Sequence, residues 1–441
     1  MMKLNKQPLS YVISALLLST PVFAADTTQS DSTSTDVKEQ SSDQTGINWD
    51  GLTFSGYARY GAHLQEGDEK YVGVVGSYNG SSGIGRLGNE ANGGEFQLNQ
   101  KFNSSTGANW DLVVMFDHWG DEVNLKKAYA GADHIFKSQP NAYIWAGRDF
   151  HQRPQQGIND YFWMSHDGQG AGIKYLDFGF AKLDLGVVSR VDNCEPTMIE
   201  EGDNPSRISC TGGANVGDDG RYAITSKLYD IQLTDFATLD IYANYGFDSD
   251  GADYADDTPA EQKDLNAYQI ATVFNTTWDK GWNRFYLRYA DNADNSVYSK
   301  TNDLTTFYAS LEGNMQVNPK TEVEYILAYH DYEVDDSNEA MDNRTNYAAI
   351  VRPMYNWNDI HSTWLEAGYQ IVDFDNESND QNSGWKFTFS QNIAIDVGST
   401  ARPMLRFYAT VGETDNEYRP DLTSDKKRDT VSLGAMFEAW W

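Results

Sequence analysis

Aromatic and arginine side chains recur two residues apart in this chain. Tyr57 precedes Arg59 in the stretch GYARYG, and Trp282 precedes Arg284 in GWNRFYLRY. A spacing of two places both side chains on the same face of a β-strand. The ring then offers an apolar surface, and the guanidinium donates charge-assisted hydrogen bonds. The pattern predicts a strand face that binds a ligand with apolar faces and a polar rim.

One short stretch has the residue types of a catalytic site. Ser165, His166 and Asp167 follow one another in WMSHDG. A Ser–His–Asp set needs its side chains to converge, whereas adjacent residues of a strand point apart. We therefore expect no enzyme, and a hydrolase built on a barrel is the alternative hypothesis.

The charged and metal-binding residue types limit the classes of partner. The seven histidines are scattered along the chain, so we expect no metal site and no cofactor. Acid-rich loops such as DDSNEAMDN leave weak Ca²⁺ binding as an open alternative. Acidic residues outnumber basic ones by 65 to 33, which argues against a nucleic acid as partner.

The elements that carry these residues have the pattern of β-strands. From about residue 50 onward, apolar and polar side chains alternate with a period of two, as in MLRFYATVG. The closing TVSLGAMFEAWW places Trp441 on a wholly apolar side and Trp440 on the mixed side. Alternately short and long polar segments, rich in Gly, Asn and Asp, separate such stretches. This organisation is typical of an antiparallel all-β protein.

A transmembrane β-barrel explains the pattern better than a soluble sandwich does. Aromatic residues lie at the ends of the outward sides, as an interfacial girdle requires. The inward sides combine Arg, Glu and Tyr, which a dry core would not tolerate. Closure of the sheet also removes exposed edges. A soluble acidic domain is the competing interpretation of the composition alone.

The N-terminal region divides into two segments ahead of the barrel. Residues 1–24 combine two lysines, a short apolar run and a small-residue cleavage site ending at Ala24, which predicts a secretory signal peptide. Residues 25–47 are almost wholly polar and predict a disordered leader. Residues 48–441 are expected to form the barrel. No stretch approaches 18 continuous apolar residues, so a helical membrane protein is excluded.

The two cysteines predict a disulfide bond. Cys194 and Cys210 bracket a polar, turn-rich segment, and no His or further Cys lies nearby to favour a metal. In an oxidising compartment they are expected to pair and close a surface loop. A disulfide that closes such a loop would stabilise the folded protein by roughly 3 kcal/mol, because it lowers the entropy of the unfolded chain.

Seven ordered blocks of sequence resemble the maltoporin-type sugar porins of Gram-negative outer membranes. These blocks are FSGYARYG, GRLGNE, YIWAGRDFHQR, NDYFWMSHDGQGAGI, VRPMYNW, ARPMLRFYAT and the final WW. The resemblance implies an 18-stranded antiparallel transmembrane β-barrel with one inward-folded constriction loop, assembled as a homotrimer in outer-membrane lipid. A lane of aromatic side chains faces charged residues across the pore.

The resemblance also implies a function. Oligosaccharides, first of all maltose and maltodextrins, would slide along the lane by facilitated diffusion. A periplasmic sugar-binding protein is a further partner that the resemblance suggests. Sucrose or β-glucosides are alternative substrates, and a general diffusion porin without sugar selectivity is an alternative function.

The aromatic lane of the family maps onto aromatic residues of this chain. The matching positions are Tyr57, Trp119, Trp282, Trp357 and Trp440. Trp119 lies one position from a Trp that the family reaches across from a neighbouring subunit. The lane Tyr expected after RLGNE is missing. Phe96 is the nearest aromatic residue, and it has the wrong parity unless a bulge occurs at Gly93–Gly94.

The polar track and the constriction of the family map onto a second set of residues. Lys126 replaces an expected Arg, which keeps the charge and loses the planar fork. Phe162 replaces the usual constriction Tyr, which keeps a ring and loses a hydroxyl. The complete set is Arg59, Arg86, Glu95, Lys126, Arg153, Asp160 and Phe162.

Overall fold

The computed structural model describes most of the chain from residue 51 onward. The described residues are 51–119, 122–191, 196–199, 207–210, 218–249, 265–335, 343–376, 378, 380–396, 398–418 and 426–441. The expected signal peptide, the expected leader and Cys194 lie outside these ranges, so the predicted disulfide bond does as well.

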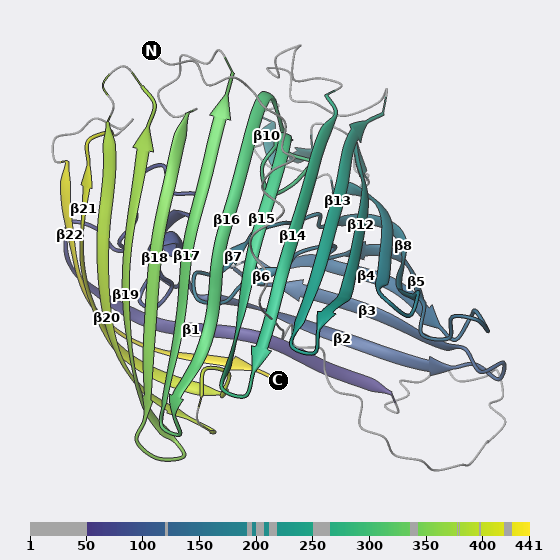
Figure 1. Ribbon diagram of the computed structural model, residues 1–441, viewed down its shortest axis with the longest axis horizontal. Coiled ribbons are helices and arrows are strands. Elements are labelled where there is room, and N and C mark those ends of the chain that lie inside the picture. Colours follow the sequence, from purple (N-terminus) through teal and green to yellow (C-terminus); the bar gives the residue numbers. More distant parts are fainter. Residues whose placement is uncertain are drawn as a thin grey trace.

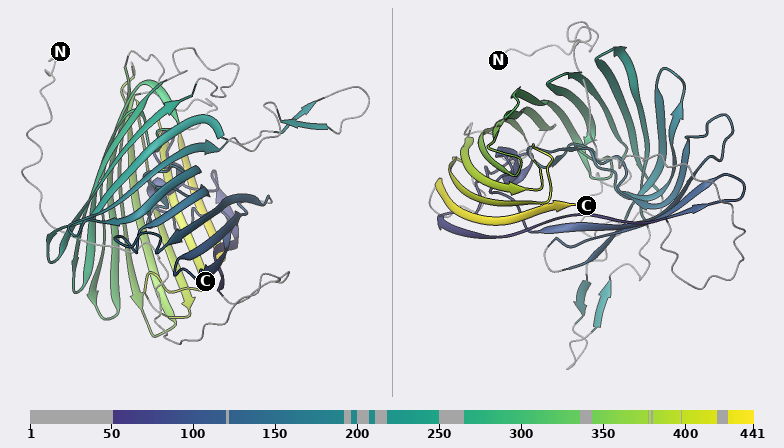
Figure 2. Two further views of the ribbon diagram at one scale, coloured as in Figure 1. Left: turned by 90° about the vertical axis from the view of Figure 1, so that its right-hand side faces the viewer. Right: turned by 90° about the horizontal axis from the view of Figure 1, so that it is seen from below.

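Eighteen antiparallel strands form one closed sheet (Figures 1 and 2). Each strand pairs with its neighbours in the chain, and the last strand returns to the first, with Trp440 opposite Tyr57. In chain order the barrel strands are β1 (Leu52–Gly67), β2 (Gly93–Asn103), β3 (Asn109–Asp117), β4 (Asn124–Asp133), β5 (Tyr143–Asp149), β8 (Gly168–Asp177), β9 (Lys182–Val191), β12 (Asp218–Thr234), β13 (Ala237–Asp248), β14 (Ala267–Trp278), β15 (Gly281–Ala293), β16 (Lys300–Asn318), β17 (Thr321–Val334), β18 (Arg344–Asn356), β19 (His361–Phe374), β20 (Gln381–Ala394), β21 (Met404–Asn416) and β22 (Lys427–Trp440).

The alternation of side chains decides which face of each strand points outward. In β20, Trp385, Phe387 and Phe389 are exposed on the outer face, whereas Lys386 and Thr388 are fully buried inside. An outer face of large apolar side chains suits lipid, and the polar inner face needs partners inside the barrel. The predicted 18-stranded transmembrane barrel is therefore confirmed.

Connections at the two ends of the barrel differ in length, as the sequence predicts. At one end β16 stops at Asn318 and β17 starts at Thr321. At the other end β1 stops at Gly67 and β2 starts only at Gly93. Figure 1 shows the tight hairpins gathered at one rim.

Two loops enter the barrel, whereas the resemblance implied one. The first inner loop, residues 68–92, carries the 3-10 helix η1 (Gly80–Ile84). The second inner loop, residues 150–167, carries the two-residue strands β6 (Gln155–Gln156) and β7 (Tyr161–Phe162), which pair with each other. The first loop is rich in glycine, and the sequence alone did not distinguish it from an ordinary external loop.

The second inner loop packs against the inner wall through aromatic rings. Trp163 lies edge-on to Tyr242 at 5.4 Å and to Tyr286 at 5.3 Å. Tyr161 meets Tyr308 in the same way at 5.3 Å. These rings form a buried cluster beneath the loop, so burial of apolar surface holds the loop inside.

The first inner loop buries aliphatic side chains against an adjoining part of the wall. Val74 and Ile84 pack with Val372 and Phe374 of β19. Leu87 packs with Trp364 in a neighbouring cluster. The two loops also touch each other, because Asn79 Nδ2 donates to the Asn159 carbonyl at 2.7 Å.

A separate hairpin lies beyond the barrel wall, where β10 (Pro196–Ile199) pairs with β11 (Arg207–Cys210) (Figure 2). No helix within the described ranges has the length and apolar character needed to cross a membrane.

Replacing Trp163→Ala should release the second inner loop. Trp163 is 1% exposed, so its removal from the ring cluster is expected to cost about 3–5 kcal/mol. We expect a lower heat-unfolding temperature and a larger single-channel conductance in a planar bilayer. Leu64→Ala, at an outward position that is 71% exposed, is the control and should change neither quantity. Unchanged conductance and stability in Trp163→Ala would contradict this packing.

Candidate functional site

A row of aromatic rings lines the lumen where β22, β1 and the end of β3 meet. The Tyr57 ring stacks on Trp440 with centroids 6.4 Å apart, and it lies 6.4 Å from Trp119 on its other side. The guanidinium of Arg59 lies 5.1 Å from the Trp119 ring and 5.9 Å from the Tyr57 ring. Three of the five predicted lane residues are thus brought together.

The last two tryptophans lie on opposite faces of the barrel wall, as the alternation predicts. Trp440 joins the inner row, whereas Trp441 lies beside Phe54 on the outer side at 5.5 Å. The backbone of Trp441 exchanges two hydrogen bonds with Gly56, which extends the pairing of β22 with β1 to the last residue.

Trp282 lies on the inner face of β15 but belongs to another part of the wall. Its neighbour of the same parity, Arg284, stacks its guanidinium 4.6 Å from the Trp282 ring. The sequence pattern correctly places both side chains on one face. The rings that meet in the row come from β1, β22 and the end of β3, not from β15.

Trp357 requires a correction, because the structure places it away from the row. It follows the end of β18, is 56% exposed, and meets the outward-facing Tyr355 edge-on at 4.7 Å. Its Nε1 donates to Thr363 Oγ1 at 2.8 Å. The buried inner tryptophan of this region is Trp364, which sequence reasoning missed. Trp364 and Glu366 lie two residues apart in STWLEAG, so they share one face of the strand, and this spacing was the available signal.

Phe96 has the outward parity that the strand pattern predicts. The pairing of β1 with β2 runs without a register shift, so no bulge turns Phe96 inward. Its ring lies 5.5 Å from Phe116 and 6.1 Å from His118. The inward positions of β2 that lie opposite Arg59 and Tyr57 are Gly93 and Glu95.

Arg59 links the wall to both inner loops. Its Nη1 lies 3.0 Å from Asp160 Oδ2 of the second loop, and its Nε donates to the Ala91 carbonyl of the first loop at 2.9 Å. Arg59 and Asp160 were both predicted for the polar track, and the structure joins them as an ion pair.

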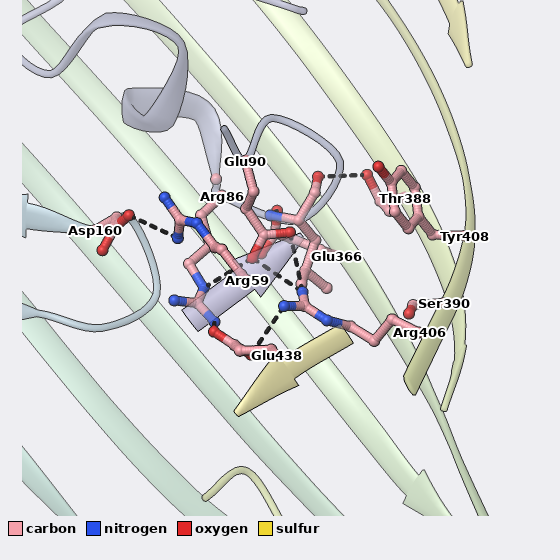
Figure 3. A network of polar contacts seen from close by, with 12 residues as sticks. Arg59, Arg86, Glu90, Asp160, Glu366, Thr388, Ser390, Arg406, Tyr408 and Glu438 are labelled. Carbon is pink, nitrogen blue, oxygen red and sulfur yellow. Dashed lines mark hydrogen bonds and ion pairs between the residues drawn. The ribbon is translucent and has the colours of Figure 1, made fainter. Parts of the chain in front are cut away.

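A buried cluster of arginines and glutamates lies next to this pair (Figure 3). Arg86 lies 2.5 Å from Glu438 and 3.4 Å from Glu90, and Arg406 contacts the same two carboxylates at 2.8 and 3.0 Å. Arg402 Nε also donates to Glu438 at 2.7 Å. Burial alone would raise the pKa of Glu90, but Arg406 and Arg86 hold that pKa below its usual value.

Sequence reasoning identified only Arg86 in this cluster. Glu438 precedes Trp440 by two residues, so its parity placed it inside. Glu90 and Arg406 lie within the blocks GRLGNE and ARPMLRFYAT, which also offered a signal. The charge pairing itself spans strands and loops that are distant in sequence.

A second buried ionic group fixes the first inner loop. Lys386 Nζ lies 2.8 Å from Glu366 and donates to the Leu87 carbonyl at 2.7 Å, while the Leu87 N–H donates to Glu366 at 3.0 Å. Arg352 contacts Glu366 at 2.5 Å and donates to the Ile158 carbonyl of the second loop at 3.0 Å. Arg352 therefore ties both loops to one carboxylate.

Arg153 is held between two rings at the constriction. Its guanidinium lies 4.0 Å from the Phe162 ring and 4.1 Å from the Phe150 ring. Asp167 lies 3.4 Å from it and Glu95 lies 4.0 Å away. Phe162 thus fixes an arginine here, a contact that needs a ring and no hydroxyl.

Lys126 reaches the lumen through a bulge in β4. The register shifts between Met115 and Phe116 on the partner strand, and Lys126 Nζ lies 3.1 Å from Asp117. The extra residue brings a second cation inward, since Lys127 pairs with Asp149 at 3.4 Å. Lys127 was missed because strict alternation assigns only one of two adjacent lysines to the lumen.

The residues of the alternative catalytic set do not converge. His166 Nε2 accepts a hydrogen bond from the Val297 N–H at 3.3 Å, and Asp167 pairs with Arg153. The Ser165 N–H donates to the Asn295 carbonyl at 2.9 Å. Among the described residues, no group of three or more His, Cys, Asp or Glu could hold a metal ion.

Replacing Lys386→Met should loosen the first inner loop. The change leaves Glu366 with one cation fewer and removes the donor to Leu87, which is expected to cost about 3–5 kcal/mol. We expect a lower heat-unfolding temperature and a larger conductance. The matched control is the double variant Glu366→Gln, Lys386→Met, which removes both charges of the pair while Arg352 keeps Glu324 as a partner at 2.8 Å, and it should be less destabilised. Equal stability of Lys386→Met and wild type would contradict a structural role for this ion pair.

Acidification through about pH 6 should change ion selectivity. Burial raises the pKa of Asp167 to about 6, although Arg153 opposes the shift. Burial also lowers the pKa of His151 to about 4 and that of His166 to about 3, so both stay neutral above pH 5. Below about pH 6 Asp167 loses its charge, and the constriction becomes more positive.

Reversal potentials under a KCl gradient at pH 7.5 and pH 5 measure this effect. Wild type should become more anion-selective at pH 5, and Asp167→Asn should show that selectivity already at pH 7.5. Asp415→Asn, at the outer end of β21, serves as control. An Asp167→Asn variant with the same pH response as wild type would show that Asp167 is not the titrating group.

One protein-family model and several solved structures are similar to this chain. The LamB porin family model matches residues 52–441. OccD3 (OpdP) of Pseudomonas aeruginosa is 11% identical, with 90% of this chain and 93% of that chain covered and a TM-score of 0.47. OmpT of Vibrio cholerae lacking loop L8 is 12% identical, with coverage of 89% and 100% and a TM-score of 0.42.

An anion-selective porin from Comamonas acidovorans is 9% identical, with coverage of 88% and 99% and a TM-score of 0.43. The family match spans every strand of the closed barrel. This chain therefore belongs to the LamB porin family and forms a channel in the outer membrane of a Gram-negative bacterium.

Proposed function

We propose that this channel carries neutral oligosaccharides, with maltose and maltodextrins as the first substrates to test. The observation that supports the proposal most directly is the row formed by Trp440, Tyr57 and Trp119 beside a polar cluster. One face of a pyranose presents C–H groups that can lie on such rings, and its rim presents hydroxyls. The site offers both kinds of partner at once.

The polar groups beside the row suit a substrate without charge. Arg59 is already paired with Asp160, and Arg402 is paired with Glu438 while its guanidinium lies 4.3 Å from the Trp440 ring. Paired ions can exchange hydrogen bonds with hydroxyls without needing a counter-charge from the ligand. A fixed anionic or cationic substrate would have to break these pairs.

Passage also requires that binding be weak. Each ring contact contributes roughly 0.5–1.5 kcal/mol, so a sugar can leave one ring for the next. A selective pore needs sites that favour entry and still permit exit. The row provides neighbouring contacts of similar kind rather than one enclosed pocket.

A general diffusion porin is the second candidate function. One observation favours it: Trp282 and Trp357 lie apart from the row. The lane is therefore shorter than the resemblance implied. Current that no sugar blocks would support this alternative.

The homotrimer, a periplasmic sugar-binding partner and weak Ca²⁺ binding by acidic loops stay predictions, as do the signal peptide and the disulfide bond. Closure of the channel in three steps in bilayer recordings would support the trimer.

Replacing Trp440→Ala should weaken sugar binding about 3- to 10-fold, because one ring contact is lost. The measurement is block of single-channel current by maltohexaose. Trp441→Ala is the matched control, since the neighbouring tryptophan faces outward beside Phe54. Equal block in the two variants would show that the row does not bind maltohexaose, and absence of block by maltohexaose in wild type would refute the maltodextrin channel.

A further inference from the structure

The inner face of β2 has no side chain at one position of the aromatic row. Gly93 is the partner of Arg59 across the β1–β2 ladder, and Glu95 is the partner of Tyr57. Both positions of β2 therefore face the lumen. The Glu95 carboxylate lies 4.0 Å from Arg153, whereas Gly93 has no side chain to cover the inner surface of the wall.

The indole of Trp119 fills the place that Gly93 leaves. A Cβ built on Gly93 would lie 2.2 Å from Trp119 Cε3 and 2.6 Å from Trp119 Cδ2. No side chain at residue 93 could coexist with the ring in this position. The contact places Trp119 directly against the backbone of β2.

The residue before Trp119 fixes its direction. The His118 N–H donates to the Gly94 carbonyl at 2.9 Å, which continues the pairing of β3 with β2. The His118 ring stacks on Tyr60 at 5.6 Å, on the outer side. Because successive residues of an extended segment point to opposite faces, Trp119 is directed into the lumen.

We propose that Gly93 and Trp119 are a matched pair that adds a third ring to the row within a single chain. This inference rests on the proposed function and names its substrate more closely. With one ring for each sugar unit, the row holds a linear oligosaccharide of three units. No second subunit is needed to supply a ring at this end.

The length of the sugar provides the test. In wild type, block of single-channel current should strengthen from maltose to maltotriose and change little from maltotriose to maltohexaose. Trp119→Ala should remove the gain between maltose and maltotriose, a loss of about 3- to 10-fold for maltotriose and little for maltose. Trp119→Phe, which keeps a ring, should restore part of the gain.

Gly93→Ala tests the pairing, because the added Cβ must displace the indole. It should reproduce the effect of Trp119→Ala, and the double variant should lose little more than either single variant. If Gly93→Ala does not assemble into a heat-stable barrel, the comparison of Trp119→Ala with Trp119→Phe decides alone. Trp110→Ala, on the outer face of β3, is the control and should behave as wild type.

The outcomes separate this inference from the proposed function. If Trp119→Ala keeps the full gain from maltose to maltotriose while Trp440→Ala weakens block, the sugar porin stands and the Gly93–Trp119 pair is refuted. If wild type is blocked by no sugar, the proposed function fails and this inference fails with it.

Discussion

The interior of this barrel depends on charges that are neutralised by one another rather than by water. Glu366 accepts from Lys386, Arg352 and the Leu87 N–H, and Arg352 also donates to the carbonyl of Ile158. Any one of these ions left alone in the interior would be costly. Together they satisfy both the wall and the backbone of the loops, so the polar inner face of the sheet can hold two loops in fixed positions.

The fixed loops give the lumen its shape and chemistry. The first loop contributes Arg86 and Glu90, and the second contributes Asp160 and Arg153, so both supply charges next to the aromatic row. The rings come from the wall and its margin, whereas the charges come from both the wall and the two inner loops. The positions of the loop charges therefore depend on how the loops are anchored, and the packing around Trp163 is part of that anchoring.

Much of the fold is readable from the sequence because a strand has a strict period of two. The period assigned Trp440 to the lumen and Trp441 to the outside, and it predicted that Phe96 points outward. It failed where a strand ends or bulges, as at Trp357 beyond β18 and at the bulge beside Lys126. Contacts between residues distant in sequence could not be predicted either. No local pattern indicates that Trp119 fills the space beside Gly93.

The most direct test of the account is an experimental structure of the protein with bound maltotriose. We predict that the sugar units lie on the rings of Trp440, Tyr57 and Trp119, that their hydroxyls point toward Arg59 and the glutamates of the buried cluster, and that both inner loops stay in place. Maltotriose bound elsewhere in the lumen, or a first inner loop displaced from Glu366 and Lys386, would contradict it.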